Sequence, residues 1–61
     1  MIDYRDISNT AKALIDQHGA AASEAAHRRS DQLFEGGDSE GSAVWRQIRA
    51  AVDELRRGAR R

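Results

Sequence analysis

The 61-residue chain contains no cysteine and no proline, and its only aromatic residues are Tyr4, Phe34 and Trp45. Without cysteine, a disulfide framework and a thiolate zinc site are both excluded. No apolar run approaches the roughly 20 residues that a membrane-spanning helix needs. The first residues also lack the basic and apolar regions of a signal peptide. Together these absences favour a cytoplasmic protein that does not enter a membrane.

Large apolar side chains are scarce as well, because much of the 39% apolar content is alanine. A domain of about 60 residues buries only about 60% of the surface that its unfolded chain exposes. A monomer with so few large side chains is therefore expected to be marginally stable. It also has too few bulky residues to enclose the pocket that a small-molecule enzyme uses. We expect a non-enzymatic protein without a cofactor, stabilised by association with another chain.

The pattern of residues predicts helices throughout a single domain, residues 1–61. In the first and last thirds of the chain, apolar residues recur at the 3.6-residue period of a helix. The middle third is rich in alanine, which has the highest intrinsic helix propensity. Glycines at positions 19, 36, 37 and 58 mark the expected helix ends. The predicted helices span about residues 3–18, 21–35 and 39–57, and a basic tail follows at 58–61.

These elements predict an all-α fold, a two- or three-helix hairpin that completes a helical bundle by oligomerising. Asp3 or Asp6 is expected near the start of the first helix, and Asp38 or Ser39 is expected to cap the third. The first two helices are either continuous as one bent rod or separated at Gly19. The inward stripe of the second helix is thin and consists of Ala22, Ala26, Leu33 and Phe34.

The apolar stripes of the first and third helices supply the predicted contact surface. A second copy of the chain, forming a dimer, is the favoured partner, and another protein is possible. Trp45 is expected to anchor the core, and the alternative is a hot spot in a partner interface, where tryptophan is enriched. The two roles coincide if the partner is a second copy of the chain. The predicted interface residues are Ile7, Leu14, Ile15, Val44, Trp45, Ile48, Val52 and Leu55.

Opposite charges are separated along a chain whose formal net charge is zero. Residues 1–40 carry four basic and eight acidic side chains, whereas residues 41–61 carry six arginines and two acidic side chains. Pairing of the basic helix with acidic helices, in its own or a neighbouring chain, is the favoured interpretation. The alternative function is a nucleic-acid-binding regulator, since arginine is well suited to phosphate contacts. Its contact residues would be Arg46, Arg49, Arg56, Arg57, Arg60 and Arg61.

Glu24 and His27 have the Glu-x-x-His spacing found in di-iron helical bundles. The neighbouring Arg28 and Arg29 would place positive charge beside a metal ion. We therefore predict no metal site and interpret these residues as a solvated helix face that continues to Asp31. No arrangement of serine, histidine and acidic residues predicts a catalytic nucleophile.

The glycine-rich turn at residues 37–41, Gly-Asp-Ser-Glu-Gly, is followed by Val44, Trp45 and Ile48. This run resembles a family of short bacterial all-helical proteins, and the resemblance spans residues 11–56. It implies a compact helical protein without assigned chemistry. The turn is also similar to that of tetratricopeptide-type hairpins, although Arg46 and Arg49 stand where that repeat has apolar or small residues.

Overall fold

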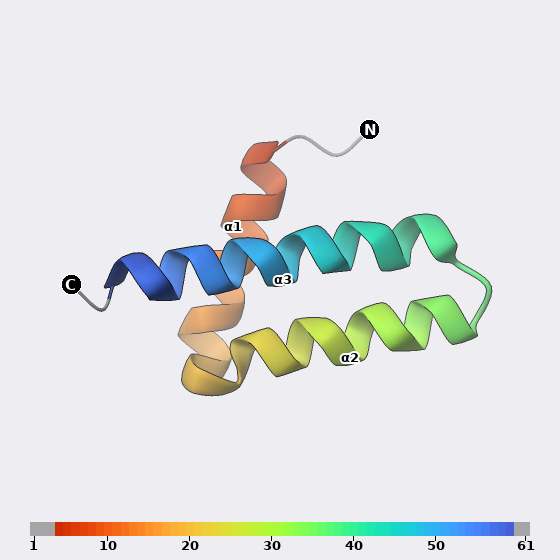
Figure 1. The fold of residues 1–61 in the computed structure, drawn as a ribbon, viewed down its shortest axis with the longest axis horizontal. Coiled ribbons are helices and arrows are strands. Elements are labelled where there is room, and N and C mark those ends of the chain that lie inside the picture. Colours follow the sequence, from red (N-terminus) through yellow and green to blue (C-terminus); the bar gives the residue numbers. More distant parts are fainter. Residues whose placement is uncertain (1–3, 60–61) are drawn as a thin grey trace.

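The computed structural model describes residues 4–59, which form three α-helices (Figure 1). Helix α1 spans Tyr4–His18, a 3₁₀ turn spans Gly19–Ala21, α2 spans Ala22–Glu35 and α3 spans Ser39–Ala59. Helices α2 and α3 lie side by side as an antiparallel hairpin, and α1 crosses behind the C-terminal half of α3. No strand occurs within residues 4–59, which confirms the all-α prediction for this part of the chain.

Helix α1 ends at His18, immediately before Gly19, so of the two arrangements that the sequence left open the separated one is found. Gly19 has a φ of +56°. This left-handed conformation costs glycine little free energy because glycine has no Cβ. The chain then passes through the 3₁₀ turn and changes direction, so α1 and α2 are two separate helices. At the other end of α1, Asp6 lies in the first turn. Its negative charge is stabilised there by the positive end of the helix dipole. Asp3 lies outside the described residues.

Two glycines and an aspartate join α2 to α3. The Asp38 N–H donates to the Leu33 carbonyl at 2.8 Å, and the Gly37 N–H donates to the Phe34 carbonyl at 3.1 Å. This pair of bonds is the Schellman pattern of a helix end, and it requires the positive φ of +90° at Gly37. Asp38 then caps α3, because its Oδ1 accepts a hydrogen bond from the Gly41 N–H at 2.8 Å.

Small residues bring α2 close to α3. Ala22, Ala26 and Ser30 recur every four residues along α2, and all three are buried. The Ser30 hydroxyl donates to the Ser42 carbonyl at 3.1 Å and lies 3.0 Å from the Ser42 hydroxyl. Both buried serines therefore have hydrogen-bond partners. The side chains that α2 presents to α3 at these positions are therefore small, and one of them bonds to the α3 backbone.

The larger core side chains come from α1 and α3. Ile7 is 7% exposed, Ile48 is 4% exposed and Val52 is fully buried, and these three join the buried alanines in one cluster. Further apolar residues pack against the cluster but keep part of their surface exposed. They are Leu14, Ile15, Val44, Trp45, Ala51 and Leu55. No helix within residues 4–59 combines the length and the apolar character needed to cross a lipid bilayer.

Two details of the sequence prediction were wrong. Phe34 is 59% exposed and does not belong to the inner stripe of α2. Successive helical residues point about 100° apart, and Leu33 is half-buried while its neighbour Phe34 faces solvent. Gly58 does not end α3, which continues to Ala59. One glycine costs a helix only about 1 kcal/mol relative to alanine, too little to stop it there.

We predict that Gly37→Ala lowers the free energy of unfolding by about 1–2 kcal/mol, because a Cβ is unfavourable in the left-handed conformation. Gly36→Ala is the control, since Gly36 has an ordinary φ of −80°. Urea denaturation followed by circular dichroism at 222 nm measures both variants. Equal stabilities of the two variants would contradict the role assigned to Gly37.

Candidate functional site

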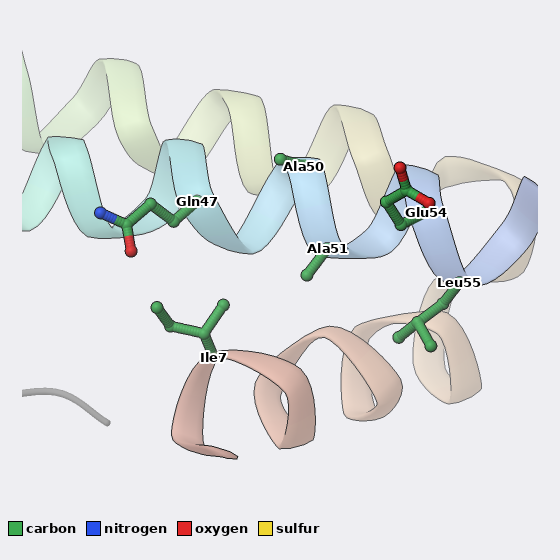
Figure 2. Close-up of a pocket in the computed structure, with 6 residues that line it drawn as sticks. All are labelled: Ile7, Gln47, Ala50, Ala51, Glu54 and Leu55. Carbon is green, nitrogen blue, oxygen red and sulfur yellow. The ribbon is translucent and has the colours of Figure 1, made fainter. Parts of the chain in front are cut away.

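A groove of about 500 Å³ opens between α1 and α3 (Figure 2). Ile7 lies on the α1 side at one end and Leu55 lies toward the other end, while Ala51 points from α3 toward α1. Gln47 and Glu54 provide the polar groups of the lining. The complete lining consists of Ile7, Gln47, Ala50, Ala51, Glu54 and Leu55.

The groove exists because two helices that cross at an angle diverge away from their closest contact. The small side chains of Ala50 and Ala51 lie on α3 in this region, and they leave open the space that leucine or isoleucine would fill. The surface is mainly apolar, and its one ionisable side chain is Glu54. An arrangement of this kind suits the apolar side chains of another polypeptide better than a charged ligand.

The eight residues of the predicted interface fall into two groups. Ile48 and Val52 are buried in the core of the single chain, and their contact with another chain stays a prediction. Ile7 is also buried in this core, although its outer edge lines the groove. The remaining five are half-buried and keep part of their side chains exposed: Leu14, Ile15, Val44, Trp45 and Leu55. Of all eight, the groove brings together only Ile7 and Leu55.

Four residues of the groove were absent from the predicted interface: Gln47, Ala50, Ala51 and Glu54. They share one face of α3 at helical spacing, so a second stripe beside the apolar one is visible in the sequence. The pattern does not reveal that α1 leaves this stripe uncovered. That depends on where α1 crosses α3.

Two arginines of the predicted nucleic-acid surface tie α3 to the rest of the fold. The Arg49 guanidinium donates to the Ser23 hydroxyl at 3.3 Å and to His27 Nδ1 at 3.2 Å, which links α3 to α2. Arg56 Nη1 donates to the Gly19 carbonyl at 2.6 Å. The positive charge of Arg56 at this position interacts favourably with the negative C-terminal end of the α1 dipole. These contacts give both arginines a structural role.

The other arginines of that surface differ in their surroundings. Arg57 lies 3.7 Å from Glu54 one turn earlier on α3. Arg46 is exposed, and Arg60 and Arg61 lie outside the described residues. Beside the 3₁₀ turn, a cleft of about 420 Å³ is lined by Arg56 and Arg57, together with Asp53. The carboxylate of Asp53 would repel a phosphate there.

The close contacts between basic and acidic side chains within residues 4–59 each lie within one helix. Arg28 is 3.3 Å from Glu24, His27 Nε2 is 3.3 Å from Asp31, and the third pair is on α3. No ion pair in this part of the chain joins α3 to α1 or α2. The prediction of charge pairing within the chain is therefore wrong for these residues, because the arginines that cross between helices bind uncharged acceptors. Pairing with a neighbouring chain stays a prediction.

The Glu-x-x-His residues do not converge on one point. Glu24 pairs with Arg28, and His27 pairs with Asp31, so the two side chains have different partners. Among residues 4–59 no group of three or more histidine, aspartate or glutamate side chains is placed to bind a metal ion.

No protein-family model, curated protein or solved structure matches this chain. The resemblance to short bacterial all-helical proteins therefore stays a prediction. Functional inference depends on the groove and on the charges of the chain itself.

We predict that Arg56→Gln lowers the free energy of unfolding by about 1 kcal/mol, the typical net value of one hydrogen bond. Arg57→Gln removes the same charge but only an exposed ion pair at 3.7 Å, which contributes little. Urea denaturation of the two variants at the same pH and ionic strength provides the comparison. If both variants unfold at the same urea concentration, Arg56 does not stabilise the end of α1.

Proposed function

We propose that this protein is a small non-enzymatic helical interaction protein that binds a polypeptide partner by helix packing in the groove between α1 and α3. The groove itself is the observation that carries this proposal. Its apolar residues, Ile7, Ala51 and Leu55, are flanked by the polar side chains of Gln47 and Glu54. Protein interfaces commonly combine an apolar centre with a polar rim in this way.

The composition of the core supports the same function. Among the six buried apolar residues, three are alanines, and Ile7, Ile48 and Val52 are the larger ones. A core this small gives limited stability to a chain of this length. A partner that binds only the folded chain stabilises it by mass action. Covering the exposed part of Leu55 and its neighbours would add apolar burial at about 25 cal/mol per Å².

The chemistry of the groove favours binding over catalysis. Its lining includes the single ionisable group Glu54 and no second acid or base. General acid–base catalysis needs a titratable side chain placed beside the reacting atom, usually with groups that orient it. Glu54 lies near Arg57, on an exposed part of α3, with 75% of its side chain accessible.

Nucleic-acid binding is the alternative function, and its support is the concentration of arginines on α3. Arg49 and Arg56 are engaged within the chain, which leaves Arg46 and Arg57 as the described arginines most available to phosphates. A mobility shift with a short DNA duplex that weakens steeply as salt rises would support this function. Absence of a shift at low salt would exclude it.

We predict that a photoreactive phenylalanine derivative at position 47 forms a covalent adduct with a polypeptide partner in living cells. The same derivative at position 32 is the control, because Gln32 is an exposed glutamine of α2 that does not line the groove. The adducts are separated by electrophoresis and identified by mass spectrometry. If position 47 yields no discrete adduct beyond those at position 32, the proposed function is wrong.

A further inference from the structure

The groove residues of α3 form a self-complementary pattern. Gln47 lies three residues before Ala50, and Glu54 lies three residues after Ala51. A two-fold axis that passes between Ala50 and Ala51 would therefore place Gln47 of each copy opposite Glu54 of the other when two α3 helices pack antiparallel. Two-fold contacts require this kind of reciprocal match, in which one surface patch is complementary to itself.

We propose that the occupant of this groove is a second copy of the chain, bound as an antiparallel two-fold dimer through α3. This inference depends on the proposed function and names its partner. In such a dimer the alanines of the two copies meet around the axis, where their small side chains allow the helices to approach closely. Ile7 and Leu55, at the two ends of the groove, are covered by the incoming copy.

The polar groups of the groove match across the same axis. The Gln47 amide of one copy can donate a hydrogen bond to the Glu54 carboxylate of the other, and the symmetry provides two such contacts. Hydrogen bonds to a charged acceptor are stronger than those between neutral groups.

Charge and helix length also agree with a second copy. The formal net charge of the chain is zero, so there is no net electrostatic repulsion between two copies. The arginines of α3 lie outside the lining of the groove, which avoids bringing them together at the axis. Because the axis falls near the middle of α3, residues 42–59 of one copy run beside residues 59–42 of the other. This overlap is about 27 Å at 1.5 Å per residue.

Sedimentation equilibrium of the full chain tests the dimer, and we expect the wild type to be mainly dimeric at protein concentrations on the order of 100 µM. In the Gln47→Glu dimer, the new carboxylate of each copy lies opposite the Glu54 carboxylate of the other copy. This repulsion occurs at both symmetry-related contacts, so we expect the dissociation constant to rise about tenfold or more. Adding Glu54→Lys to this variant restores opposite charges across the axis. The double variant is expected to return to within about threefold of the wild-type dissociation constant.

Gln32→Glu is the matched control, because it makes the same charge change on an exposed site of α2, away from the groove. Its dissociation constant is expected to equal that of the wild type. Circular dichroism at 222 nm verifies that every variant keeps its helix content, so that a loss of dimer reflects the interface and not unfolding.

Three results would overturn the inference. The wild type could remain monomeric at concentrations on the order of 1 mM, the Gln47→Glu variant could dimerise as well as the wild type, or the added Glu54→Lys could fail to restore the dimer. A monomeric wild type whose position 47 crosslinks to a different protein would refute the second copy and support the proposed function. Absence of any adduct at position 47 would refute the proposed function itself.

Discussion

The close contact between α2 and α3 is the constraint on which the rest of the structure depends. Ala22, Ala26 and Ser30 present almost no bulk to α3, so the two backbones approach closely and the Ser30 hydroxyl finds its partners on Ser42. Such a contact removes little apolar surface from water. The hairpin therefore needs a third layer, and α1 provides it by bringing Ile7 into one cluster with Ile48 and the other core residues.

The same shortage of large side chains that permits the tight hairpin leaves the surface of the molecule incomplete. Helix α1 crosses behind α3 at an angle (Figure 1), and some of the apolar surface beside the crossing stays open. Beside the crossing, Ala50 and Ala51 leave a groove that Ile7 and Leu55 border (Figure 2). The core and the candidate binding surface thus share a physical origin. In both places, the small size of alanine decides how closely a neighbouring helix can approach.

The arginines of α3 show that separation of charge along a sequence does not by itself produce ion pairs between helices. Exposed ion pairs contribute little, because water screens both charges and long side chains lose freedom when they pair. The Gly19 carbonyl accepts the Ala22 N–H within the 3₁₀ turn, and Arg56 donates a second hydrogen bond to it. Arg49 likewise contacts the neutral acceptors Ser23 and His27. These arginines stabilise the fold through hydrogen bonds to uncharged groups.

The sequence by itself indicated the helical segments, the glycines at their ends and a cap of α3 at Asp38 or Ser39. Each depends on hydrogen bonds and apolar spacing within a turn or two of one helix, which the order of residues specifies directly. Only the tertiary structure decided that Ile48 is enclosed by its own chain, that Phe34 faces solvent and that Gln47 borders a groove. These outcomes depend on where α1 crosses α3, and that position is set by contacts between residues far apart in the sequence.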